Sequence, residues 1–138
     1  MGMQKEIFDF LGTQRVGVFA IRMLDGSPHG ATVHFAYMEH PLTFIFLTSP
    51  TYRKVEPLKQ GEAQASFVVG TSEEVMKTLQ MDGVANLADT EELRAAYFRT
   101  FPEKLKDDRG GIFFTFTPTW WRFTDWTKPE GKTVLTSE

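Results

Sequence analysis

Hydrophobic and polar residues alternate along much of this chain in short runs, which is the pattern of strands in a sheet. The run from Val16 to Met23 has apolar residues at both odd and even positions, which predicts a strand buried on both faces. Further strand-like runs cover about 30 to 38, 42 to 48 and 63 to 69. A turn signal, Asp25-Gly26-Ser27-Pro28, separates the first two runs, so the first three are predicted to form an antiparallel meander.

The segment from 75 to 88 fits two different structures. Thr71-Ser72-Glu73-Glu74 has the form of a helix-capping box, but the residues from 75 to 81 alternate as in a strand. We favour a strand with a bulge near Gly83. Two aromatic strands, 112 to 116 and 120 to 126, are predicted on either side of Pro118.

Helical periodicity is confined to two regions. Four apolar residues before Gly12 predict a short N-terminal helix that covers a core: Ile7, Phe8, Phe10 and Leu11. Asp89-Thr90-Glu91-Glu92 is a capping box, and Pro102 ends the helix that follows it. The apolar face of this second helix is predicted to comprise Leu93, Ala96, Tyr97 and Phe101.

These elements predict a mainly β fold, a small closed or split barrel of about six antiparallel strands with a few helices. The chain of 138 residues fits one domain, which we assign to residues 1–127, followed by a polar C-terminal tail of residues 128–138 that we expect to be loose. With 13 Phe, 3 Trp and 3 Tyr, one barrel of this size cannot easily cover every aromatic ring, so we expect a homodimer.

Charge and composition exclude several classes of protein. The net charge of -3 comes from 15 basic and 18 acidic residues that are mixed along the chain, which argues against a nucleic-acid or membrane partner. Without cysteine, the chain has no disulfides, thiolate metal sites or cysteine nucleophile. Charges interrupt the first ten residues, so no signal peptide is indicated and we expect a cytoplasmic protein.

Histidine and serine patterns suggest neither a metal site nor a hydrolase. His29 and His34 are five positions apart and would point to opposite faces of a strand, and His40 sits in a turn. No serine lies in a G-x-S-x-G motif. We therefore assign no catalytic residue.

The segment from 44 to 54 carries the clearest chemistry. A buried strand ends in Thr48 and Ser49, Pro50 redirects the chain, and Thr51 is placed to cap a short helix that starts with Arg53-Lys54. Backbone N–H groups, a helix dipole and two cations would then face one anion, as in a phosphate clamp. An Arg-Lys pair alone is more often a solvated surface pair. Pro57 should shorten or kink this helix.

The order of these motifs resembles the pyridoxamine 5'-phosphate oxidase-like, FMN-binding split-barrel family. The resemblance spans about Ile7 to Trp126 and is carried by residues 26–35, 46–58, 63–69 and 79–85. It implies an FMN-binding homodimer with the flavin at the interface. The cofactor contacts implied for the ring, ribityl chain and phosphate are Ala31, Thr32, Val33, His34, Leu47, Thr48, Tyr52, Arg53 and Lys54.

Two of these positions depart from the family's pattern, since Ala31 replaces an arginine and Tyr52 a small hydroxyl residue. Tryptophans of the partner subunit could complete the flavin pocket, and the candidates are Trp120, Trp121 and Trp126. An alternative interpretation of these rings is core or interface packing.

The resemblance implies an FMN-dependent oxidoreductase that acts on a small molecule whose identity the sequence does not give. The C-terminal Arg-x-His pattern of the oxidase proper is absent from residues 120–126, so we do not predict oxidation of vitamin B6. Two alternatives stay open. One is a non-catalytic protein that binds or sequesters a flavin or heme, and the other is a deazaflavin-dependent reductase.

Overall fold

The computed structural model describes residues 3–107 and 110–138. Residues 1, 2, 108 and 109, which belong to the predicted domain, lie outside the described residues. The helices are α1 (Lys5–Gly12), η1 (Arg53–Val55), η2 (Pro57–Gln60), α2 (Glu91–Thr100) and η3 (Pro102–Asp107), where η marks a 3-10 helix. The strands are β1 (Val16–Arg22), β2 (Pro28–His34), β3 (Ala36–Glu39), β4 (Leu42–Thr48), β5 (Ala63–Val69), β6 (Lys77–Leu87), β7 (Ile112–Asp125) and β8 (Thr133–Thr136).

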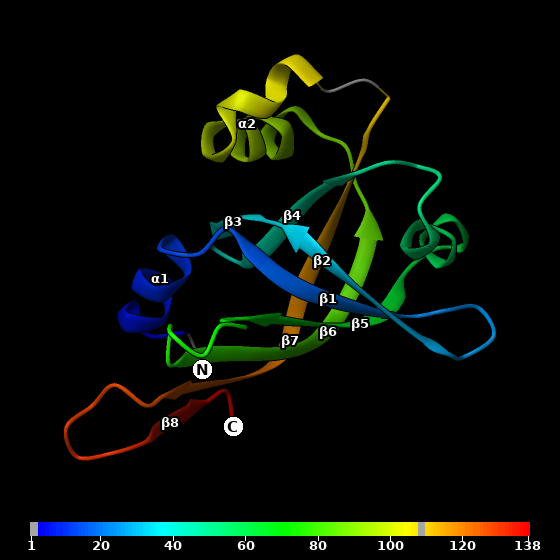
Figure 1. Ribbon diagram of the computed structural model, residues 1–138. Helices are drawn as coiled ribbons and strands as arrows, with labels where there is room; N and C mark the ends of the chain where they lie inside the picture. The colour runs from blue at the N-terminus through cyan, green and yellow to red at the C-terminus, as the bar shows by residue number, and fades with distance from the viewer. Residues whose placement is uncertain (1–2, 108–109) are drawn as a thin grey trace.

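All eight strands belong to one antiparallel sheet, in the order β2-β1-β5-β6-β7-β4-β3, with β8 also paired to β7. The sheet curls so that β2, at one end of this order, also lies beside β4 near the other end (Figure 1). The predicted mainly β barrel is confirmed as a curled half-barrel. The bulged strand predicted near Gly83 is also confirmed, because β6 shifts register between Asp82 and Gly83.

The predicted meander is confirmed in its two antiparallel hairpins, β1–β2 and β3–β4, but its middle run is not one continuous strand. The run from 30 to 38 divides at Phe35 into β2, which pairs with β1, and β3, which pairs with β4. Phe35 is buried in the barrel, and its backbone N–H donates to the Arg15 carbonyl at 3.0 Å. This break carries the chain from one end of the strand order to the other and closes the curl.

The two strands predicted around Pro118 form one 14-residue strand, β7. Pro118 is aligned with Gly83 at the register shift of β6, where the missing N–H of proline removes no regular ladder bond. A Cβ atom at Gly83 would come within 2.1 Å of the Thr117 carbonyl oxygen. Glycine at 83 and proline at 118 therefore fit each other, and the strand continues.

The interior of the barrel is dominated by phenylalanine, including Phe19, Phe44, Phe46, Phe67, Phe114 and Phe116. Helix α1 covers this core with Ile7, Phe10 and Leu11, as predicted. Strand β1 differs from the prediction of burial on both faces, since Val16 and Val18 are 37% and 38% exposed. No described element of the same chain covers that outer face.

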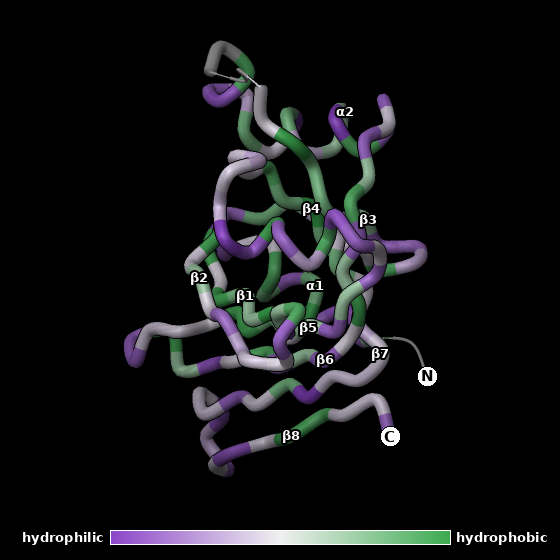
Figure 2. Tube along the Cα trace, turned by 90° about the vertical axis from the view of Figure 1, so that its right-hand side faces the viewer, coloured by the Kyte–Doolittle hydropathy of each residue, from purple (hydrophilic) through white to green (hydrophobic). Residues whose placement is uncertain are grey.

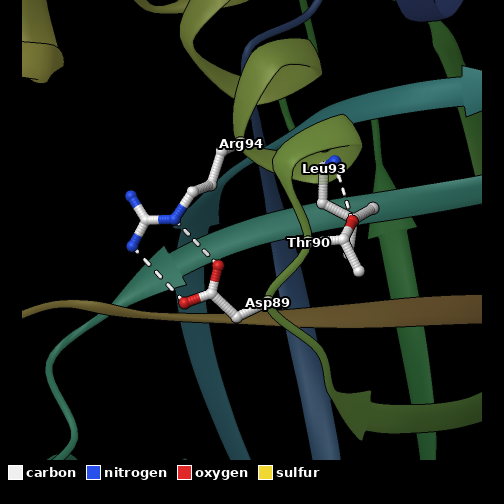
Figure 3. A network of polar contacts seen from close by, with 4 residues as sticks. All are labelled: Asp89, Thr90, Leu93 and Arg94. Atoms are coloured by element: carbon white, nitrogen blue, oxygen red, sulfur yellow. Dashed lines mark hydrogen bonds and ion pairs between the residues drawn. The ribbon is translucent and has the colours of Figure 1, made fainter.

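Helix α2 packs on the outside of the sheet against β3 and β4, through a second cluster that contains Ile45, Tyr97, Phe101 and Phe113. Its predicted apolar face is confirmed. The cap differs by one residue from the predicted box, because Thr90 is the N-cap and accepts a 3.1 Å hydrogen bond from the Leu93 N–H (Figure 3). Asp89 instead pairs with Arg94, whose Nε lies 2.8 Å from the Asp89 Oδ1.

Strand β8 was not predicted, because it lies inside the polar segment that was expected to be loose. It pairs with β7 over Thr133–Thr136 and lies at the end of the molecule away from α2 (Figures 1 and 2). Within residues 3–107 and 110–138, no helix is both long enough and apolar enough to span a bilayer.

Candidate functional site

A cavity of about 360 Å³ opens where β2, the end of β4, η1 and η3 meet, and we call it the lysine cavity. Its volume lies within the range of small-molecule sites. It is lined by Thr32, Val33, His34, Leu47, Thr48, Ser49, Tyr52, Lys54, Lys104 and Gly111.

Seven of the residues predicted to contact a cofactor line this one cavity: Thr32, Val33, His34, Leu47, Thr48, Tyr52 and Lys54. Three chain segments that are separate in sequence therefore converge as the sequence analysis expected. Ala31 directly precedes the three lining residues of β2 but does not itself line the cavity. Arg53 is also outside the lining and is exposed.

The chain after β4 does not form the expected helix. Thr51 caps nothing; instead its hydroxyl lies 3.0 Å from the Ser49 hydroxyl. Arg53–Val55 and Pro57–Gln60 are two short 3-10 helices, so the kink predicted from Pro57 is confirmed. Helices of this length add little dipole, so the positive character of this segment comes from its side chains.

Lys54 is the notable cation of the segment. Its side chain is only 7% exposed, and it forms no ion pair or hydrogen bond with any described residue. Its ammonium group makes a cation–π contact with the Tyr52 ring, with 4.7 Å between Nζ and the ring centroid. Burial lowers the pKa of Lys54 below its ordinary value, because a desolvated ammonium is less stable than a neutral amine. A buried cation of this kind is poised to receive an anion.

Thr48 supplies a second polar group without a partner. Its side-chain oxygen is fully buried and makes no hydrogen bond in the described part of the chain. Buried hydroxyl groups are normally hydrogen-bonded, and leaving one unpaired costs about 1–3 kcal/mol. The lysine cavity is thus lined by two residues, Lys54 and Thr48, whose polar groups lack a partner among the described residues.

Lys104, from η3, brings a further cation to the cavity and was not predicted. Its Nζ lies 3.3 Å from the Tyr97 hydroxyl and 4.6 Å from the Phe101 ring centroid. The neighbouring Glu103 is engaged elsewhere, with its Oε1 2.6 Å from Arg15. Nothing in the local sequence distinguishes Lys104 from a surface lysine, because only the packing of α2 brings η3 to the cavity.

The pKa values of Tyr97 and His34 are set first by burial and then by the charges of Lys104, Arg15 and Glu103. Burial raises the pKa of Tyr97 to about 12. The pKa of His34 is lowered, first by burial and then by the charges of Lys104 and Arg15. His34, whose ring packs edge-on against Phe101, therefore favours its neutral form in this cavity.

The tryptophans lie away from the lysine cavity of their own chain. The Trp121 side chain belongs to the core inside the barrel, and it lines a different cavity together with Phe8 and Pro118. Trp120 is half-buried and donates from its indole N–H to Glu138, and Trp126 is 45% exposed. Their predicted contact with the cofactor of a partner subunit stays a prediction.

Solved structures with the same fold include proteins of several descriptions. General stress protein 26 from Bacillus anthracis matches with a TM-score of 0.69 at 15% identity, over 86% of this chain and 91% of that one. The heme storage protein HutZ from Vibrio cholerae matches with a TM-score of 0.65 at 19% identity, over 86% and 91%.

A heme binding protein from Mycobacterium smegmatis matches with a TM-score of 0.68 at 14% identity over 92% of this chain, which spans 55% of that protein's length. At these identities the matches establish the fold alone. A search of curated proteins found no match.

The family itself is established by a family model for pyridoxamine 5'-phosphate oxidase, which matches residues 3–125. That range includes every strand of the barrel except β8 and every residue of the lysine cavity. The chain therefore belongs to the pyridoxamine 5'-phosphate oxidase-like split-barrel family.

Proposed function

We propose that this protein binds FMN in the lysine cavity and acts as an FMN-dependent oxidoreductase on a small-molecule substrate. The observation that carries the proposal is the presence, in one cavity, of a buried lysine without a counter-ion and a buried threonine hydroxyl without a hydrogen-bond partner. A phosphate monoester offers a dianion and several acceptor oxygens, so it satisfies both groups at once.

The remaining lining residues fit the rest of such a ligand. Ser49 and Tyr52 add hydroxyl groups beside Lys54, while Val33 and Leu47 offer apolar surface to a flat ring. Arg53, which is exposed beside Lys54, can contribute only a screened charge. FMN bound here supplies a two-electron redox centre, which the side chains of this protein do not provide.

His34 is the residue that we place on the substrate side of the cavity. Its neutral imidazole can donate or accept one hydrogen bond, and the nearby Lys104 ammonium can hold a negatively charged group. These are positioning roles, and we assign no proton transfer to either residue.

We further propose that the protein is a homodimer in which β1 faces the partner. The outer side of β1 exposes Val16 and Val18, and the neighbouring positions Ala20 and Gly30 are small, which leaves a flat surface suited to close packing. Trp120 also lies on the outer side of the sheet and is the tryptophan best placed to serve a partner's cofactor. Analytical ultracentrifugation of the wild type and of Val18→Glu tests this: the change should yield monomers.

Titration with FMN and with riboflavin, followed by quenching of flavin fluorescence, tests the central proposal. Because the two ligands differ only by the phosphate, we expect FMN to bind at least tenfold more tightly than riboflavin. The FMN complex should then be reduced by NADH or NADPH under anaerobic conditions. Absence of quenching at saturating FMN would overturn the proposal, and bound flavin that is never reduced would favour a binding protein without turnover.

Heme is a second candidate ligand, supported by His34. Two proteins with this fold are described as binding or storing heme, and His34 is a cavity residue whose lowered pKa favours the neutral imidazole that a metal requires. Titration with hemin should then give a Soret shift that His34→Ala removes. An unchanged shift in that variant would leave heme without a specific site in this cavity.

A further inference from the structure

A second cavity, of about 330 Å³, lies at the opposite end of β4 from the lysine cavity, and we call it the tryptophan cavity. Helix α1, the β3–β4 turn and the middle of β7 form its walls. It is lined by Met3, Phe8, Glu39, His40, Pro41, Leu42, Thr117, Pro118 and Trp121. Nothing in the proposed FMN site uses these residues, except that Trp121 was a sequence-based candidate for a partner's flavin.

The walls of this cavity are mainly apolar and include two aromatic rings, Phe8 and Trp121. The Phe8 ring is held in place by stacking on Tyr37, with 6.4 Å between the centroids. Trp121 is only 6% exposed and is fixed within the main core. A cavity of this size, lined by two aromatic side chains, suits a flat molecule of one or two rings.

Trp121 also presents a hydrogen-bond donor without a partner. Its indole N–H donates to no acceptor among residues 3–107 and 110–138. The backbone of Trp121, by contrast, is fully used, since its N–H and carbonyl both bond to Ser137. An ammonium group has no acceptor for this N–H, so the indole N–H adds nothing to a preference for cations and serves as the reporter of binding in the cavity.

The lining contains one carboxylate, that of the exposed residue Glu39, and one imidazole, that of His40. Glu39 lines the cavity without an ion-pair partner among the described residues, and neither lysine nor arginine is part of the lining. Its field reaches the hydroxyl of Tyr37, whose pKa is raised first by burial and then by Glu39 and Asp9. Asp9 is already paired with Lys5 at 2.8 Å, which leaves Glu39 as the available carboxylate.

We propose that the tryptophan cavity is a second ligand site, which binds a small aromatic amine. The ring of the ligand lies between Phe8 and Trp121, and its ammonium group pairs with Glu39. Aromatic rings and a carboxylate together favour a cation over a neutral or anionic molecule of the same shape. This site is independent of the proposed FMN site and does not require that proposal to be correct.

The test uses three probes of nearly equal size and different charge: 2-phenylethylamine, 2-phenylethanol and phenylacetate. Each is titrated into the full-length protein while the three tryptophan indole N–H signals are followed by NMR, and Trp121→Phe identifies the signal of Trp121. We expect the amine to move that signal saturably and to bind about fivefold more tightly than the alcohol. Phenylacetate should bind most weakly.

Matched substitutions locate the charge effect. Glu39→Gln should remove the advantage of the amine over the alcohol, whereas Glu62→Gln, an exposed change before β5, should preserve it. Equal affinity for amine and alcohol in the wild type would overturn the proposal, as would the absence of any saturable shift. A Trp121 signal that moves with protein concentration alone would show that a second copy of the chain covers the cavity, and would also overturn it.

Discussion

The lysine cavity and the tryptophan cavity lie at opposite ends of β4, and their chemistry is opposite as well. Leu42, the first residue of β4, lines the tryptophan cavity, and Thr48, the last residue, lines the lysine cavity. A strand of seven residues separates its two ends by about 20 Å. One lining has two lysines and no carboxylate; the other has Glu39 and neither lysine nor arginine.

The difference shows which parts of this fold determine ligand specificity. Both cavities rest on the same phenylalanine-rich strands, whose inward residues serve packing. The charged groups come from segments at the strand ends: η1 and η3 at one end, and the β3–β4 turn at the other. Such segments can change without loss of the core, so one barrel can serve different ligands.

Removing the shared support should have the largest effect. Phe46 lies in the middle of β4, is 1% exposed and stacks on Phe114 with 4.7 Å between centroids. Phe46→Ala should lower the free energy of unfolding by about 3–5 kcal/mol, because it leaves a hole in a packed core. Urea denaturation measures this. Val16→Ala, on the exposed face, is the control and should cost under about 1 kcal/mol; similar losses would mean that β4 is not the common support.

Removing one charge should separate the two cavities. Lys54→Met keeps the unbranched stem but removes the ammonium group, and it should weaken FMN binding about thirtyfold, which corresponds to about 2 kcal/mol for a charge-assisted contact. Riboflavin affinity should stay within about threefold, and binding of 2-phenylethylamine should not change. Arg53→Met, beside it but exposed, should weaken FMN binding much less. Equal losses for FMN and riboflavin would place the phosphate elsewhere.

The same substitution should leave a signature in the pH dependence of stability. The pKa of Lys54 is lowered in the folded protein by burial, whereas the unfolded value is near 10.5. Between those two values the unfolded chain binds more protons, so the stability of the wild type should rise with pH. Lys54→Met should lack this rise and should be the more stable protein near neutral pH. If the stability of the wild type and that of Lys54→Met changed in parallel from pH 7 to 10.5, the burial of the Lys54 ammonium would be contradicted.

The smallest predicted effect concerns His34. Its pKa lies below the ordinary 6.5 first because of burial and then because of Lys104 and Arg15. Lys104→Met removes one of these charges and should raise the pKa of His34 part of the way toward 6.5, as measured by NMR titration of the imidazole. Glu39→Gln, in the other cavity, is the control and should not shift it. An unchanged His34 pKa in Lys104→Met would contradict the placement of Lys104 beside His34 in the lysine cavity.

Sequence patterns predicted the parts of this structure that depend on local chemistry. Short apolar runs identified β1, β4 and β5, and a turn, a bulge and a helix boundary followed from Gly26, Gly83 and Pro102. What failed depends on distant contacts. The break at Phe35 is set by the Arg15 carbonyl, and the continuity of β7 through Pro118 is set by Gly83 on another strand.

The candidate site divides in the same way. The converging segments 32–34, 47–48 and 52–54 could be inferred because their order in the chain resembles a known family. Lys104 could not, since it reaches the cavity only after α2 packs on β3 and β4. Which member of the Arg53-Lys54 pair is buried also required the structure, because the turn geometry of η1 decides it.

A crystal structure of the protein with FMN tests the central claim most directly. We predict phosphate oxygens within about 3 Å of the Lys54 Nζ and the Thr48 hydroxyl, which would give both buried groups their partners. The flavin ring should lie against Val33 and Leu47, near His34. A phosphate bound to Arg53 alone, or flavin in the tryptophan cavity, would contradict the account.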